Sequence, residues 1–137
     1  MSSLGIIANP ASGKDIRRLV SYATIIDNQG KENIIKRLVV AAQSLGVDEI
    51  LFMPDSYHFG EAVIGDLRSD HRLTTSCEVM DLPIYASQKD TIRAAAEMER
   101  RRVGCIVVLG GDGTSRAVAK SVHDTPILPL STGTNNA

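Results

Sequence analysis

The sequence has 137 residues, a formal net charge of −1 and 43% hydrophobic residues, which fits one globular domain with its own core. Acidic and basic residues are interspersed, so an electrostatic nucleic-acid binder is excluded and no nucleic-acid partner is expected. No stretch approaches the roughly 18 apolar residues of a membrane span, and the N-terminus does not read as a signal peptide. We therefore expect a cytoplasmic protein without a membrane partner, in which Cys77 and Cys105 are inert thiols in buried strands.

The first half of the chain alternates apolar runs with helical patterns. A strand is predicted at residues 4–8, followed by a polar loop at 9–14 and a short helix at 15–22. Residues 27–30, Asp-Asn-Gln-Gly, are typical of a turn. Apolar residues at helical spacing then predict a helix over 31–45, ended by Gly46. A second strand at 49–53 and a second amphipathic helix at 59–68 complete this half.

The second half repeats the alternation. A strand is predicted at 75–80, and Asp90 is the expected N-cap of a helix over 91–102. A buried strand at 105–109 leads into a glycine-rich loop, a helix at 114–123 and a last short strand at 127–130. This order predicts an α/β fold, namely a doubly wound, mostly parallel five-stranded sheet with helices on both faces. The arginine run at 100–102 lies where cations complement a helix dipole.

The glycine-rich loop is the strongest functional signal. The apolar strand empties directly into Gly110-Gly111-Asp112-Gly113-Thr114. Glycine allows positive φ and close approach of the main chain to a ligand, and the start of the following helix attracts phosphate. The Asp112 carboxylate opposes phosphate unless it holds a cation or accepts a proton from an attacking hydroxyl. The loop therefore predicts that the protein binds a phosphate group and carries out a reaction on it. The alternative is a tight turn in which Asp112 only caps the helix.

Two further polar loops follow predicted strands, at residues 9–14 and 131–136. Ligands of open α/β sheets bind outside the carboxyl ends of the strands, so we expect the three loops to converge on one crevice. Neither common nucleotide motif is present, because a Walker A loop needs other residues than Ala8 and Asp15, and the glycines at 110, 111 and 113 do not fit G-x-G-x-x-G. Lys14 is either a point charge for phosphate or a solvated surface group.

These motifs resemble one superfamily. Asn-Pro-Ala-Ser-Gly-Lys at 9–14, Leu-Gly-Gly-Asp-Gly-Thr at 109–114 and Ser-Thr-Gly-Thr-Asn-Asn at 131–136 are similar to those of NAD kinases and of diacylglycerol and sphingosine kinases. With Asp90-Thr91 ahead of the glycine block, the chain most resembles the branch of acetoin catabolism protein X, which is NAD kinase-like. The resemblance runs from Ile6 to the last residue. It implies that residues 1–137 are the N-terminal α/β nucleotide-binding domain of a longer protein with a β-rich C-terminal domain.

The resemblance also implies an ATP-dependent phosphotransferase that uses ATP and Mg²⁺, with NAD as a candidate substrate and no dedicated metal site. Asp112 is then the catalytic residue acting on the acceptor hydroxyl. The implied nucleotide-binding residues are Asn9, Ser12, Gly13, Lys14, Gly110, Gly111, Gly113, Thr114, Thr132, Gly133, Thr134 and Asn135. The alternatives are a diacylglycerol-type lipid kinase and a non-catalytic nucleotide-binding accessory protein of acetoin catabolism. The sequence leaves open which molecule accepts the phosphoryl group and whether ATP or polyphosphate donates it. It also leaves open whether the protein forms a homo-oligomer.

Overall fold

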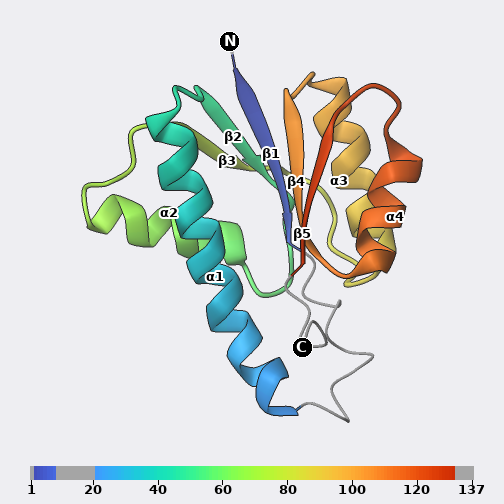
Figure 1. Cartoon of the computed structure of the whole chain (residues 1–137), viewed down its shortest axis with the longest axis horizontal. Helices are drawn as coiled ribbons and strands as arrows, with labels where there is room; N and C mark the ends of the chain where they lie inside the picture. The colour runs from blue at the N-terminus through green and yellow to red at the C-terminus, as the bar shows by residue number, and fades with distance from the viewer. Residues whose placement is uncertain (1, 9–20, 132–137) are drawn as a thin grey trace.

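The computed structural model describes residues 2–8 and 21–131, and it shows one parallel sheet between two pairs of helices (Figure 1). In chain order the elements are β1 (Ser3–Ala8), α1 (Ser21–Ser44), β2 (Glu49–Phe52), α2 (Phe59–Ser69), β3 (Ser76–Val79), α3 (Gln88–Arg100), β4 (Cys105–Gly110), α4 (Asp112–Ser121) and β5 (Ile127–Ser131). Every strand pairing is parallel, which confirms the predicted α/β class. No helix in the described ranges is long and apolar enough to cross a bilayer.

The strand order, β3-β2-β1-β4-β5, reverses direction at the centre of the sheet. The chain moves outward from β1 to β3, then returns to the other side of β1 to form β4 and β5. The register pairs Ala8 of β1 with Leu109 of β4, and Gly110 of β4 with Ser131 of β5. The carboxyl ends of β1, β4 and β5 are therefore neighbours around the switch point, which is where open α/β sheets bind ligands.

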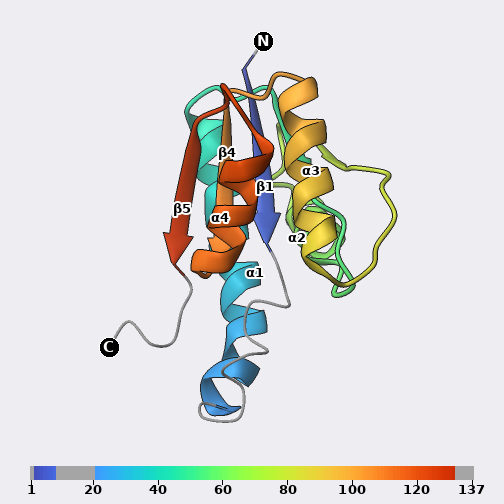
Figure 2. The same cartoon turned by 90° about the vertical axis from the view of Figure 1, so that its right-hand side faces the viewer.

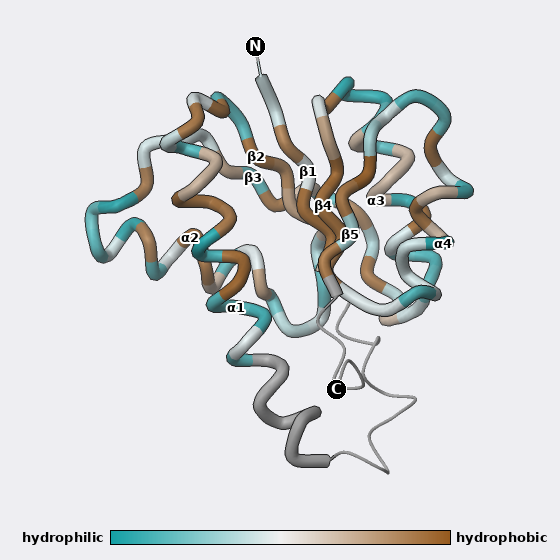
Figure 3. Tube along the Cα trace, in the orientation of Figure 1, coloured by the Kyte–Doolittle hydropathy of each residue, from teal (hydrophilic) through white to brown (hydrophobic). Residues whose placement is uncertain are grey.

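The side chains of each central strand alternate between two separate apolar layers. In β1, Ile6 and Ala8 pack in the layer under α1 and α2, whereas Ile7 packs in the layer under α3 and α4. Figure 1 shows α1 and α2 on one side of the sheet and α3 and α4 on the other, and Figure 2 views the molecule from the side of α3 and α4. Figure 3 shows that the central strands are among the most hydrophobic segments. This two-sided burial explains why the strands read as continuous apolar runs in the sequence.

The predicted turn at residues 27–30 is wrong, because α1 is one continuous helix through these positions. Each residue added to an existing helix gains a backbone hydrogen bond, and Gly30 costs only about 1 kcal/mol relative to alanine there. Gly46, at φ +89°, follows the end of α1 as predicted. The helix predicted at 15–22 lies outside the described residues except for its last two positions, which belong to α1.

The start of α3 also differs from the prediction. Ser87, not Asp90, is the N-cap, and its hydroxyl accepts a hydrogen bond from the Lys89 N–H at 3.2 Å. The buried Asp90 carboxylate instead accepts the backbone N–H groups of Tyr85 and Ala86, both at 2.9 Å. Asp90 thus holds the connection that leads into α3, since its side chain reaches back beyond the helix start. The other described boundaries agree with the predictions to within two residues.

Candidate functional site

The glycine-rich loop lies at the carboxyl edge of the sheet, beside the switch point. β4 ends at Gly110, and the N-cap of α4 is Gly111, which has no side chain to cap the helix. The first turn is closed by a hydrogen bond from the Ser115 N–H to the Gly111 carbonyl at 3.2 Å. The N-terminus of an α-helix carries a partial positive charge and presents backbone N–H groups, so this loop brings an anion-attracting end to the edge of the sheet.

None of the loop glycines has a positive φ, so of the two properties that glycine allows, only close approach of the main chain applies to this loop. Gly111 is extended, at φ −91° and ψ −173°, and among the described glycines Gly46 is the one with a positive φ. Packing among the described residues does not require Gly111 or Gly113 either, because a Cβ added at each would meet none of their atoms within 4 Å. Both glycines therefore leave open space outside the main chain, as close approach of a ligand requires.

Asp112 lies between these two glycines, in the first turn of α4, and is exposed. The N-cap of α4 is Gly111 and not Asp112. The alternative in which Asp112 only caps the helix is therefore wrong. Its charge still favours the helix through the dipole, by about 0.3–1 kcal/mol. The carboxylate lies at the surface of the carboxyl edge, where a hydroxyl or a cation on a bound ligand can reach it.

Gly110 and Thr114 lie beneath this exposed tip. Thr114 is buried, and a Cβ added at Gly110 would be 3.1 Å from the Thr114 hydroxyl oxygen. The Gly110 position is thus tight against α4, in contrast to Gly111 and Gly113. The five predicted residues of this loop divide into an exposed tip of Gly111, Asp112 and Gly113 and a packed base of Gly110 and Thr114.

The N-terminus of α3 lies beside that of α4. The Gln88 side-chain amide donates a hydrogen bond to the Gly113 carbonyl at 3.3 Å, so it links the first turns of the two helices. Sequence reasoning missed Gln88, because the contact depends on how α3 and α4 pack. Ser87 is the sequence feature that could have revealed it, because serine is a common N-cap. A helix that starts after Ser87 places Gln88 at the same edge of the sheet as the glycine loop.

The other predicted site residues lie outside the described residues. They are Asn9, Ser12, Gly13 and Lys14 after β1, and Thr132, Gly133, Thr134 and Asn135 after β5. The structure does bring together the strand ends that lead to them, since Ala8 and Ser131 are paired with β4 on either side. The convergence of the three loops stays a prediction. The strand order agrees with it, because β1, β4 and β5 are neighbours in the sheet.

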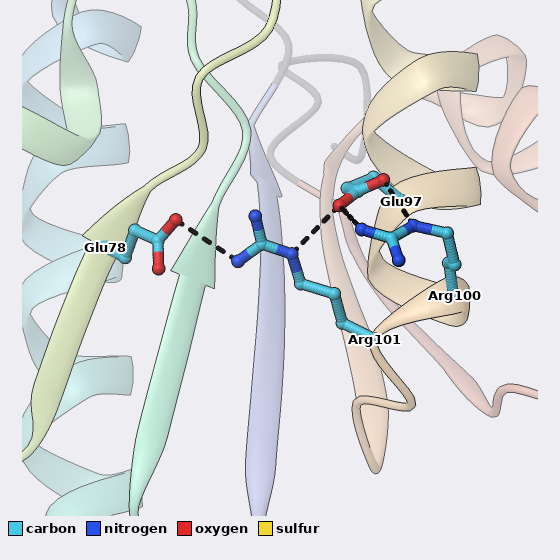
Figure 4. A network of polar contacts seen from close by, with 4 residues as sticks. All are labelled: Glu78, Glu97, Arg100 and Arg101. Carbon is cyan, nitrogen blue, oxygen red and sulfur yellow. Dashed lines mark hydrogen bonds and ion pairs between the residues drawn. The ribbon is translucent and has the colours of Figure 1, made fainter.

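Other ionisable groups serve the fold. Arg100 and Arg101 both donate hydrogen bonds to Glu97, and Arg101 also bonds Glu78 at 3.1 Å (Figure 4). The hydrogen bonds from Arg100 and then Arg101 lower the pKa of Glu97 to about 2. This arginine run is therefore engaged mainly in ion pairs at the end of α3.

The histidines and cysteines give no second candidate site in the part of the chain that the structure describes. His58, His71 and His123 are each exposed, and no group of three metal-ligating side chains occurs among the described residues. Cys77 and Cys105 are half-buried, less than predicted, and burial raises the pKa of both thiols. Thiols with raised pKa values are poor nucleophiles, which agrees with a structural role.

At the amino edge of the sheet, the Glu99 carboxylate accepts backbone N–H groups from His123, Asp124 and Thr125 at 2.9, 2.9 and 3.1 Å. These bonds, led by that of Asp124, lower the pKa of Glu99 to about 2. A surface pocket is lined here by Glu99, Arg102, Val103, Asp124, Thr125 and Pro126. It lies at the opposite end of the strands from the glycine loop.

Comparison with known proteins identifies the family of the chain. Residues 4–137 match the family described as the ATP-NAD kinase N-terminal domain. The chain is 41% identical over 137 residues to acetoin catabolism protein X of Cupriavidus necator, a match that covers 98% of the chain and 38% of that relative. The chain thus spans about two fifths of the relative's length. No solved structure matches significantly. The chain belongs to the ATP-NAD kinase N-terminal domain family.

Proposed function

We propose that the chain is the nucleotide-binding domain of an ATP-dependent phosphotransferase similar to NAD kinase. One observation carries the proposal: the exposed Asp112 stands at the start of α4 between two glycines whose missing side chains leave open space. This loop adjoins the switch point between β1 and β4. Neither backbone conformation nor internal packing accounts for Gly111 and Gly113, whereas a phosphate approaching the main chain does.

Phosphoryl transfer depends mainly on positioning and on neutralising charge, so it asks little covalent chemistry of the protein. The N–H groups at the start of α4 bind phosphate oxygens, and Asp112 accepts the proton of the attacking hydroxyl. The residues fit Mg²⁺ that arrives with the nucleotide, because Mg²⁺ at such sites is held by one or two carboxylates together with phosphates. Asp112 is the described carboxylate that would hold it, and the ion would neutralise phosphate charge.

The loops after β1 and β5 complete the proposed site. Asn9, Ser12, Gly13 and Lys14 would meet the phosphates from the β1 side, and Thr132, Gly133, Thr134 and Asn135 would meet the nucleotide from the β5 side. Recognition of the acceptor would come from a further domain. On this proposal the 137 residues alone bind nucleotide but transfer phosphate poorly or not at all.

The test of the proposal is Asp112→Asn in the longest natural polypeptide that contains this chain. Removal of a general base lowers turnover by roughly 10²–10⁴-fold, and the isosteric amide should leave the affinity for ATP without Mg²⁺ nearly unchanged. Asp124→Asn is the control, because this exposed carboxyl lies at the opposite edge of the sheet. Unchanged turnover in Asp112→Asn would contradict the catalytic role.

One alternative is favoured by a specific finding. The matched relative is named for acetoin catabolism and not for a reaction, so a nucleotide-binding protein that assists acetoin breakdown without catalysis is the second candidate. Calorimetric titration with ATP, NAD and NADH, followed by an assay for NADP, separates the two. Binding together with NADP formation supports the kinase, and binding without any product supports the accessory protein. Sedimentation with lipid vesicles would reveal a lipid kinase instead.

A further inference from the structure

Lys31 is a lysine inside the protein. Its relative exposure is 3%, and it is the one buried cation among the residues that the structure describes. Lysine is almost never fully buried unless it is paired, and Lys31 does have an interaction within the chain. The function derived above makes no use of this residue, although burial of a charge is costly and calls for a reason.

Lys31 belongs to the face of α1 that packs on the sheet. Lys31, Ile35, Val39 and Ala42 follow one another at helical spacing, and all four are buried. The last three join the apolar layer that contains Ala8 and the β4 residues Val107 and Leu109. Lys31 precedes Ile35 by four residues, so its Cα lies about 6 Å further toward the start of the helix. The buried face of α1 is therefore apolar from Ile35 onward and carries a cation, Lys31, one turn nearer the start of the helix.

The start of α1 is at the carboxyl edge of the sheet. The helix runs back from the carboxyl side of β1 to the amino side of β2, and Figures 1 and 2 show its first half extending past the edge where β1 and β5 end. Side chains on a helix tilt toward its N-terminus, which directs the Lys31 stem toward that same edge. Lys31 thus lies on the α1 face of the sheet toward the carboxyl edge, the edge at which the glycine loop leaves β4.

We propose that the Lys31 ammonium group binds a phosphate of the nucleotide, an inference that rests on the proposed function. The charged group of the loop from Gly110 to Thr114 is the Asp112 carboxylate, so this loop alone does not balance the charge of a triphosphate. An ammonium group supplies a compact positive charge, and its interaction with phosphate is stronger where water is excluded. Phosphate binding would explain why a lysine occupies the buried face of α1 at its end near the carboxyl edge of the sheet.

The test compares Lys31→Met with Lys36→Met in the longest natural polypeptide that contains the chain. Methionine keeps most of the buried stem and removes the charge. Lys36 is a matched control on the same helix, because it is partly exposed and pairs with Asp66 at 2.7 Å away from this edge. Calorimetry would measure the Kd of Mg·ATP and of adenosine at two salt concentrations, and thermal melting would check folding.

Lys31→Met should weaken Mg·ATP binding by about tenfold or more, the loss expected for one charge-assisted hydrogen bond. Adenosine binding should stay unchanged, the salt dependence of the Mg·ATP Kd should flatten, and Lys31→Arg should recover part of the affinity. Lys36→Met should bind as the wild type does. Wild-type Mg·ATP affinity and salt dependence in Lys31→Met would overturn the role of Lys31 alone. A wild-type protein that binds neither ligand would overturn the proposed function as well.

A measurement on the wild-type protein covers the case in which Lys31→Met does not fold. The side-chain methylene signal of Lys31, assigned with Lys31→Arg, should shift when Mg·ATP is added and stay in place when adenosine is added. A Lys31 signal that responds to neither ligand, while backbone signals do respond to Mg·ATP, would contradict the proposal.

Discussion

The two ends of α4 differ in how the neighbouring backbone is held. At the amino edge, the Glu99 carboxylate takes up the backbone N–H groups of the loop that leads into β5, and the Arg101–Glu97 pair closes the end of α3. At the carboxyl edge, α4 starts at Gly111, which has no side chain to serve as a cap. The backbone after α4 is thus held by a carboxylate of the chain itself, whereas the start of α4 is exposed at the carboxyl edge.

The glycines show the same contrast. Gly5 lies against Met98 and Gly60 lies against Val79 and Phe52, so both are small because the core leaves no room. Gly111 and Gly113 have no neighbours within 4 Å of an added Cβ in the part of the chain that the structure describes. The surroundings of a glycine therefore show whether packing requires it, and because Gly65 is equally open, the functional argument for Gly111 and Gly113 rests also on their place at the carboxyl edge.

Substitution of a core glycine should give the largest loss of stability. A Cβ at position 5 would overlap the Met98 sulfur, so Gly5→Ala should lower the free energy of unfolding by about 1–3 kcal/mol, as overpacking does. Urea unfolding followed by circular dichroism measures this. An unchanged midpoint and slope would mean that the Met98 side chain adapts freely, and the contrast between the two sets of glycines would weaken.

Substitution at the exposed tip should separate binding from stability. Gly113→Ala adds a methyl group in open space in the first turn of α4, so it should keep or raise stability by up to about 1 kcal/mol and weaken Mg·ATP binding by roughly tenfold. Gly65→Ala is the matched control, since Gly65 is an exposed helical glycine of α2 with equally open surroundings. The account predicts unchanged binding for Gly65→Ala. Equal affinities in both variants would show that no ligand approaches Gly113.

The amino edge should show a pH-dependent stability. The pKa of Glu99 is lowered from 4.5 to about 2, mainly by the Asp124 N–H and then by those of His123 and Thr125. A lowered pKa means that the carboxylate stabilises the fold fully above pH 4.5 and that this stabilisation is lost as the pH falls toward 2. Glu99→Gln should therefore melt a few degrees lower at neutral pH.

The melting temperature of Glu99→Gln should also change less between pH 4.5 and 2 than that of the wild type. Some dependence remains, because Glu97 has its pKa lowered to about 2 as well. Parallel curves of melting temperature against pH for the two proteins would refute the role assigned to Glu99.

The smallest effect concerns Cys77. Burial raises the pKa of its thiol to about 11, so the thiolate fraction near neutral pH is very small. Iodoacetamide should modify Cys77 slowly in the folded protein and much faster in urea, as mass spectrometry would record. Rapid modification of the folded protein would place Cys77 among reactive thiols instead.

The sequence predicts the strands and the order of elements well, because strands buried on both faces leave continuous apolar runs. It fails at residues 27–30, where turn-forming residues are carried within a helix, and at Asp90, whose side chain caps a connection and not the helix. The tip at Gly111–Gly113 is found because its residues are contiguous. The Gln88 contact to Gly113 depends on how two helices pack, and the burial of Lys31 depends on where α1 meets the sheet, so neither follows from local patterns.

The most direct test of the central claim is a titration of the ¹⁵N-labelled protein with Mg·ATP, followed by amide correlation spectra. The account predicts that the amide signals of Gly111, Gly113 and Thr114 shift with a common Kd, while those of His123 and Thr125 at the amino edge stay in place. Shifts confined to the amino edge, or glycine signals that do not move at saturating Mg·ATP, would contradict phosphate binding at the start of α4.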